Sequence, residues 1–162
     1  MTASGHPLHA AASAAEPLHT CEQFAFTANA PLDVAWPLFG ANKERVWAPD
    51  WNPVFVWPVN ALDREGMVFK VPRGHKTAIW VNTALDRLAN RIQYVYVLPD
   101  VVLTVITLQL TPTAQSTHVA VTYSRTALEV AANDLVREMA SQDRGAGRDW
   151  DLQINTYLRQ RR

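Results

Sequence analysis

A change in the spacing of apolar residues near position 128 constrains the fold of this chain more than any other feature. Before it, five segments have strand composition and only short, turn-like links between them: residues 66–71, 76–85, 91–98, 101–110 and 117–126. From Leu128 to Leu158 the apolar residues instead recur at helical spacing. Parallel strands need a crossover, usually a helix, between them, so the sequence predicts an antiparallel sheet followed by a long helix.

The chain before residue 66 predicts one further strand and a pair of short helices. Phe24 and Phe26 share one face of an extended segment, residues 22–30. Residues 31–48 favour two short helices, because Pro31 suits a first helical position and Gly40 suits a helix end. The prolines of the next stretch, WAPDWNPVFVWP, favour extended backbone. We therefore expect an α+β fold with six or seven strands.

The C-terminal helix is expected to cover the inner face of a curved sheet and close the core. Its inward-facing stripe is predicted to consist of Leu128, Leu135, Met139, Trp150 and Ile154. Gly145 and Gly147 lie within this stretch and predict a helix that is loosened or interrupted near them.

Composition limits the domain organisation and the function classes. A chain of 162 residues with 48% hydrophobic residues suits one domain, for which we expect residues 21–162, preceded by a disordered tail at 1–20. Equal numbers of basic and acidic residues, 15 each, disfavour nucleic acid and anionic membrane surfaces as partners. The single cysteine, Cys21, fits a reducing, cytoplasmic location, and no apolar run is long enough for membrane insertion. We expect a monomer or a homodimer.

Three segments carry a family resemblance: FAFTANAPLDVAWPLF, RVWAPDWNPVFVWP and VTYSRTALEVAAND. In these segments and in its order of elements, the chain resembles the START/Bet v1-like superfamily, also called SRPBCC or polyketide cyclase/dehydrase-like, over about residues 22–160. The WAPDW run with the later YSRTAL is similar to small bacterial members. The resemblance implies a helix-grip fold, in which an antiparallel sheet wraps around the C-terminal helix. The chain lacks the extended glycine-rich loop of the plant members, which argues against a phytohormone receptor.

A helix-grip fold leaves a cavity between sheet and helix, and such cavities are mostly apolar with a few polar groups. The candidate ligand-binding residues are large side chains of the strands and of the inward helix face: Trp80, Tyr94, Tyr96, Tyr123, Leu135, Met139 and Trp150. For each of them, plain core packing is the alternative. Trp47 and Trp51 flank a proline-containing turn, where they either gate the cavity mouth or anchor the helical pair to the sheet.

No catalytic residue is assigned from the sequence. His75 and His118 have side chains that titrate near neutral pH, but no carboxylate recurs at a spacing that would orient them. No metal, phosphate-loop or dinucleotide motif is present, so we expect no metal and no cofactor. Asp63 is expected in a solvated hairpin, and Arg125 and Asn133 in a helix cap or a surface ion pair.

Three function hypotheses remain open. The leading one is binding or carriage of a small hydrophobic ligand, such as a lipid, a fatty acid or an aromatic polyketide-like molecule. The alternatives are a cyclase/aromatase-type enzyme, in which Tyr94, Tyr96 or His118 assists proton transfer in the same pocket, and an interaction module resembling the chaperone ATPase activators of the superfamily. The fold alone does not choose among them.

Overall fold

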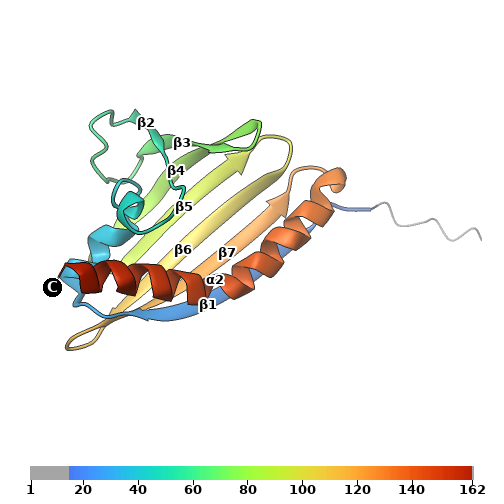
Figure 1. Cartoon of the computed structure of the whole chain (residues 1–162). Helices are drawn as coiled ribbons and strands as arrows, with labels where there is room; N and C mark the ends of the chain where they lie inside the picture. The colour runs from blue at the N-terminus through green and yellow to red at the C-terminus, as the bar shows by residue number, and fades with distance from the viewer. Residues whose placement is uncertain (1–14, 162) are drawn as a thin grey trace, which may run out of the picture.

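A seven-stranded antiparallel sheet forms the body of the protein, in a computed structural model that describes residues 15–161 (Figure 1). Its strands are β1 (His19–Ala28), β2 (Val54–Trp57), β3 (Val68–Arg73), β4 (Lys76–Asp86), β5 (Arg91–Leu98), β6 (Val102–Pro112) and β7 (Thr117–Ala127). They lie in the order β1-β7-β6-β5-β4-β3-β2, so that consecutive strands from β2 to β7 are neighbours and β1 pairs with β7. The predicted antiparallel sheet and closing C-terminal helix are confirmed.

Two strands differ from the sequence-based expectation. β2 lies inside the proline-marked stretch, for which only extended backbone was expected, and β1 begins at His19. Part of the expected tail therefore belongs to the domain: the N–H of Leu18 donates to Asn133 Oδ1 at 2.7 Å, and Asn133 Nδ2 donates to the carbonyl of Glu16 at 2.9 Å. Asn133 thus connects the start of the domain to the start of the long helix and makes no helix cap. Residues 1–14 of the expected tail lie outside the described residues.

Alternation along the strands places the large side chains on the inner, concave face. In β5 the buried residues are Ile92, Tyr94, Tyr96 and Leu98, as the sequence predicts. The register aligns Trp80, Tyr96, Thr104 and Arg125 in one row across β4 to β7, and Tyr94, Ile106 and Tyr123 in the next row. Adjacent strands thus place next to one another side chains that lie far apart in the sequence.

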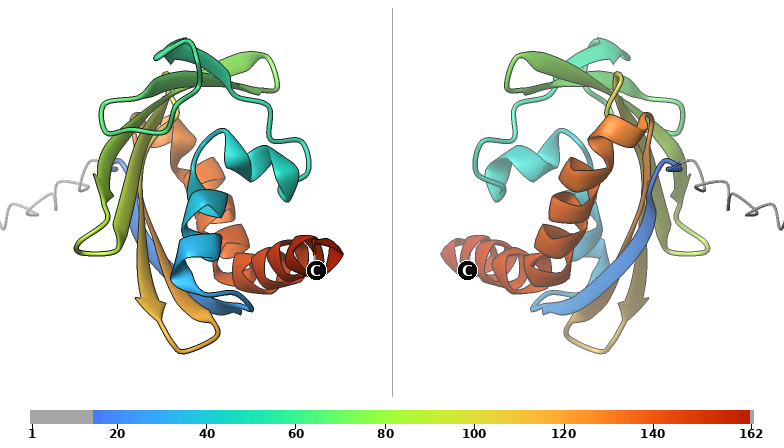
Figure 2. Two further views of the ribbon diagram at one scale, coloured as in Figure 1. Left: turned by 90° about the vertical axis from the view of Figure 1, so that its left-hand side faces the viewer. Right: turned by 90° about the vertical axis from the view of Figure 1, so that its right-hand side faces the viewer.

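Three short helical segments follow β1 and lie inside the curve of the sheet: α1 (Leu32–Ala35), η1 (Trp36–Phe39) and η2 (Lys43–Val46) (Figure 2). They bury Leu38 and Phe39 in the core. Two indoles fix the following turn to this helical segment, since Trp47 Nε1 donates to the carbonyl of Leu38 and Trp51 Nε1 to that of Ala41, both at 2.7 Å. The segment is thereby held against the sheet.

The long helix α2 (Asn133–Gln160) follows a short turn, η3 (Val130–Ala132), and is continuous over 28 residues. The expected interruption near the glycines is therefore wrong, although Figure 1 shows that α2 bends along its length. Gly147 has a packing role: a Cβ there would lie 3.1 Å from Phe24 Cδ2, so glycine lets α2 approach β1 closely. Gly145 meets nothing within 4 Å.

The inward stripe of α2 agrees only in part with the expected one. Ile154 is buried, and Met139 and Trp150 pack against the core, as predicted. Leu135 is 42% exposed, and Leu128, 41% exposed, lies before η3 and outside α2. The buried residues of α2 are Val136, Ala140, Asp143, Gly147, Ile154, Asn155 and Leu158. Neighbouring positions differ by about 100° around a helix, so a shift of one residue turns Leu135 outward. Among the described residues, no helix combines the length and hydropathy needed to cross a membrane.

Candidate ligand-binding pocket

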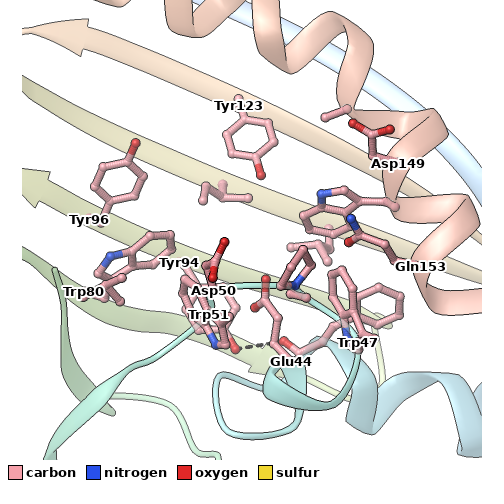
Figure 3. A pocket seen from close by; sticks show the side chains of 18 of the residues that line it. Glu44, Trp47, Asp50, Trp51, Trp80, Tyr94, Tyr96, Tyr123, Asp149 and Gln153 are labelled. Atoms are coloured by element: carbon pink, nitrogen blue, oxygen red, sulfur yellow. Dashed lines mark hydrogen bonds between the residues drawn. The ribbon is translucent and has the colours of Figure 1, made fainter. Parts of the chain in front are cut away.

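A cavity of about 370 Å³ lies between the concave face of the sheet, the turn after η2 and the middle of α2. Its wall includes Tyr94, Ile106 and Tyr123 from the strands, and Ala146 and Trp150 from α2. Figure 3 shows the labelled side chains surrounding this space. The volume falls in the range of pockets that hold small organic molecules.

Aromatic rings form a large part of the wall. Trp80 stacks on Tyr96 with ring centroids 4.3 Å apart, and Trp51 meets Trp80 edge-on at 5.3 Å. On the other side, Trp47 meets Trp150 edge-on at 5.2 Å. Such mutual packing holds each ring in a fixed orientation, so the aromatic part of the cavity surface is preformed. Polar atoms form about as much of the surface as apolar atoms, and the charged and amide side chains that line it are Glu44, Asp50, Arg73, Arg125, Asp149 and Gln153.

A buried ion pair lies at one end of the pocket. Arg125 on β7 contacts Asp143 on α2 through two hydrogen bonds, Nε to Oδ2 at 2.6 Å and a terminal nitrogen to Oδ1 at 2.8 Å. The other terminal nitrogen donates to Tyr96 Oη and to Thr104 Oγ1. Burial by itself lowers the pKa of Arg125. The hydrogen bonds to Asp143 have the opposite effect and, with the nearby Tyr96, outweigh burial, so the pKa lies above its ordinary value and the guanidinium stays charged. The expectation of a cap or surface ion pair for Arg125 is wrong.

Glu44 brings an acidic group into the pocket from η2 (Figure 3). Its carboxyl group has no hydrogen-bond or ion-pair partner within residues 15–161. Burial raises the pKa of Glu44 to about 8, an effect that Arg73 weakens and Asp63 strengthens. Glu44 is therefore mostly protonated at neutral pH and ionises within the physiological range.

Two tyrosines lie near Glu44 and differ in their hydrogen bonding. Tyr94 Oη donates to the carbonyl of Phe39 at 3.0 Å. Tyr123 Oη has no hydrogen-bond partner in the described part of the chain, and in Figure 3 it points into the pocket from the side opposite Glu44. Burial, followed by the charge of Glu44, raises the pKa of Tyr123, so its hydroxyl stays protonated and available as a donor.

The raised pKa of Glu44 predicts a pH-dependent stability. Between its ordinary value of 4.5 and about 8, the folded protein binds a proton that the unfolded chain has lost, so the free energy of unfolding falls as pH rises through this window. We expect Glu44→Gln to match the wild type near pH 4.5 and to be about 1–3 kcal/mol more stable at pH 8–9, allowing for residual solvation. Urea unfolding across this pH range measures the difference.

A matched control for this measurement is Glu138→Gln, which removes an exposed carboxylate of α2. Its stability difference from the wild type is expected to stay small at every pH. A Glu44→Gln difference that is equally flat would show that the Glu44 carboxyl is well solvated in the folded protein.

The structure brings most of the predicted site residues together. Trp80, Tyr94, Tyr96, Tyr123 and Trp150 all line the pocket. Two do not: Leu135 is exposed on the outer side of α2, and Met139 is partly buried against the core outside the pocket wall. Whether the five pocket residues bind a ligand stays a prediction.

The histidines and the polar turn lie elsewhere. His75 and His118 are exposed and outside the pocket, so His118 is poorly placed to act there. Asp63 is not in a freely solvated hairpin, because its carboxyl group packs against Gly40 and its Oδ1 atom is buried. Among the described residues, no cluster of His, Cys, Asp and Glu side chains is arranged to hold a metal ion.

Four residues in or beside the pocket were not evident from the sequence: Glu44, Asp149 and Gln153 in its lining, and Asp143, which pairs with Arg125. Glu44 lies in the charged run NKER, a pattern typical of a solvated helix face. Arg125 carried a usable signal, since it alternates with Val121 and Tyr123 on the inward face of its strand.

No family model and no curated protein matches the chain. Solved structures do match. Norcoclaurine synthase from Thalictrum flavum is 10% identical, with a TM-score of 0.67 over 91% of this chain and 99% of that chain. The Zhui aromatase/cyclase from Streptomyces sp. R1128 is 14% identical, with a TM-score of 0.65 over 90% of this chain and 97% of that one.

An uncharacterized protein from Rhizobium leguminosarum is also similar, with 14% identity and a TM-score of 0.63 over 90% of this chain and 97% of that one. Identities this low speak for the fold alone. They confirm the predicted helix-grip fold.

Proposed function

We propose that this helix-grip protein binds a small, mainly apolar aromatic molecule in the pocket beneath α2. The observation that carries the proposal is the preformed aromatic wall, in which the stacked Trp80 and Tyr96 face a cavity of about 370 Å³. Flat rings pack best against such surfaces, and each aromatic pair adds about 0.5–1.5 kcal/mol beyond the burial of area. A planar aromatic ligand therefore suits this pocket better than a long, flexible lipid chain.

The structural neighbours support an aromatic ligand. One structure of norcoclaurine synthase is a complex with dopamine and hydroxybenzaldehyde, both small aromatic molecules. Another neighbour is an aromatase/cyclase. These proteins share the fold of this chain, so a cavity in the same architecture is physically able to hold a ring system.

Binding is tested with N-phenyl-1-naphthylamine, an uncharged aromatic probe whose fluorescence rises in apolar surroundings. The wild type is expected to bind it. Ala146→Phe places a phenyl ring in the pocket from α2 and is expected to weaken binding about tenfold or more, because the added ring occupies ligand volume. A fluorescence titration measures both affinities.

The matched control is Ser141→Phe, which adds the same ring at an exposed position of α2 outside the pocket wall. It is expected to bind the probe like the wild type. Equal affinities for all three proteins would show that the probe binds outside the pocket. A wild type that does not bind the probe would contradict the proposed function.

A cyclase/aromatase-type enzyme is the second candidate function, and one observation favours it. The Glu44 carboxyl, without a protein partner among the described residues, faces the same pocket. By contrast, the hypothesis of an interaction module gains no support from the pocket, because such a module works through its outer surface.

A further inference from the structure

Two polar groups that face the pocket, the carboxyl of Glu44 and the hydroxyl of Tyr123, make no hydrogen bond to the described part of the chain. Several polar side chains around the pocket are engaged: Trp47 and Trp51 donate to backbone carbonyls, Tyr94 donates to Phe39, and Arg125 is paired with Asp143. Glu44 and Tyr123 make no such bond among residues 15–161, and the same holds for Trp80 Nε1, Asp149 and Gln153. The carboxyl of Glu44 and the hydroxyl of Tyr123 are not sealed inside the protein but open into the pocket, where they are available to a ligand.

These two groups reach the pocket from opposite walls. Glu44 comes from η2 and Tyr123 from β7 on the concave face of the sheet, and Figure 3 shows the carboxyl group and the hydroxyl group directed into the same space. They are close enough for the charge of Glu44 to influence the Tyr123 hydroxyl. A ligand ring held by the aromatic wall would therefore lie between an acid–base group and a hydrogen-bond donor.

We propose that Glu44 and Tyr123 form a proton-transfer site, in which Glu44 removes a proton from the carbon beside the carbonyl of an aromatic ketone and Tyr123 donates a hydrogen bond to the carbonyl oxygen. This inference rests on the proposed function, because the ketone must first bind in the pocket. Glu44 is then a catalytic residue, and the substrate class is narrowed to enolisable ketones attached or fused to an aromatic ring.

The step is balanced without any co-reactant. The C–H bond beside the carbonyl breaks, its proton joins a Glu44 oxygen, and its electron pair forms the carbon–carbon double bond of an enolate. The π electrons of the carbonyl move to oxygen, where the Tyr123 O–H stabilises the new negative charge. Return of the proton from Glu44 to a carbon of the enolate completes an isomerisation or, in heavy water, an isotope exchange.

The surroundings of Glu44 suit this role. The charged and titratable groups that act on it or share its part of the pocket are Arg73, Asp63, Asp50, Asp149, Tyr94 and Tyr123. The largest effect on its carboxyl is burial, which disfavours the charged form. A carboxylate that is disfavoured in this way is a stronger base once it ionises, and its ionisation near pH 8 keeps both forms accessible.

The test follows hydrogen–deuterium exchange at the carbons beside the carbonyl of 2-tetralone, by mass spectrometry in heavy water. We expect exchange above the buffer rate, rising with pH through about 8 as Glu44 ionises. Glu44→Gln should lower the protein-dependent rate about tenfold or more, and Tyr123→Phe, which keeps the ring, should also lower it. Glu138→Gln, exposed on α2, should leave it unchanged.

Calorimetric titration of 2-tetralone separates binding from proton transfer. Glu44→Gln is expected to bind it with nearly wild-type affinity, and Tyr123→Phe, which loses the hydrogen bond to the carbonyl oxygen, with an affinity lowered by at most about tenfold. Both variants are expected to exchange it slowly. Binding by the wild type with an exchange rate equal to that of Glu44→Gln overturns the inference and leaves the proposed function standing. A wild type that does not bind 2-tetralone also overturns the inference, and the naphthylamine titration then decides the proposed function independently.

Discussion

Replacing Asp143 by alanine is expected to lower the free energy of unfolding by about 3–5 kcal/mol, the largest effect of any single substitution considered for this protein. Arg125 would keep its charge but lose both hydrogen bonds to the carboxylate, in a position where its side chain is only 8% exposed. Its remaining partners, Tyr96 and Thr104, are neutral acceptors and do not compensate the charge. Urea unfolding followed by circular dichroism measures the loss.

The matched control is Asp134→Ala on the same helix. Asp134 pairs with Arg137 three residues away, but both side chains are largely exposed, so the loss is expected to stay below about 0.5 kcal/mol. The double variant Arg125→Met with Asp143→Leu removes both buried charges and should recover part of the stability lost in Asp143→Ala. An Asp143→Ala protein within about 1 kcal/mol of the wild type would contradict a desolvated ion pair.

The sheet was predictable because alternation is a local property. In β5 the sequence RIQYVYVL places tyrosines on one face and valines on the other, whatever the partner strands are. The order of the elements then left one architecture in which a final helix covers the sheet. β2 escaped prediction because its four residues lie between prolines, where turn and strand signals conflict.

The exact face of α2 could not be fixed from the sequence. Leu135 and Val136 are both apolar neighbours, and the helical period accepts either as the inward residue. The choice is made by tertiary packing: Gly147, and with it Val136 and Ala140, faces the sheet because only there can the helix backbone approach Phe24. Only Leu135 is therefore misplaced within α2, whereas Trp150 and Ile154 of the predicted stripe do face the core.

The aromatic half of the site was predictable, and the charged half was not. Large residues on inward strand positions mark the pocket wall, as Tyr94 and Tyr123 do. Arg125 and Asp143 are 18 positions apart on a strand and a helix, so no spacing rule connects them. Glu44 becomes a pocket residue only when the turn after η2 folds over the sheet, and this depends on contacts such as the Trp51 hydrogen bond to Ala41.

Ending the chain at Gly145 is expected to abolish cooperative unfolding. The removed half of α2 contains Trp150, Ile154 and Leu158, which pack against the core. Burial of three such side chains contributes about 5–9 kcal/mol, which approaches the whole stability of a typical domain. The truncated chain should lose its sharp urea transition and bind naphthalene-sulfonate dyes, which report exposed apolar surface.

Two hydrogen bonds between the removed part of α2 and the end of β1 add to the effect of this truncation. Asn155 accepts a hydrogen bond from the N–H of Asn29 at 2.8 Å and donates to the carbonyl of Thr27 at 2.9 Å, so it fixes the end of β1 to α2. Ending the chain at Arg159 instead removes only exposed terminal positions of the described helix and should leave the transition almost unchanged. The two truncations therefore differ in whether they remove the buried stripe of α2, and a fragment ending at Gly145 that unfolds in one sharp transition would show that the sheet is stable without this cover.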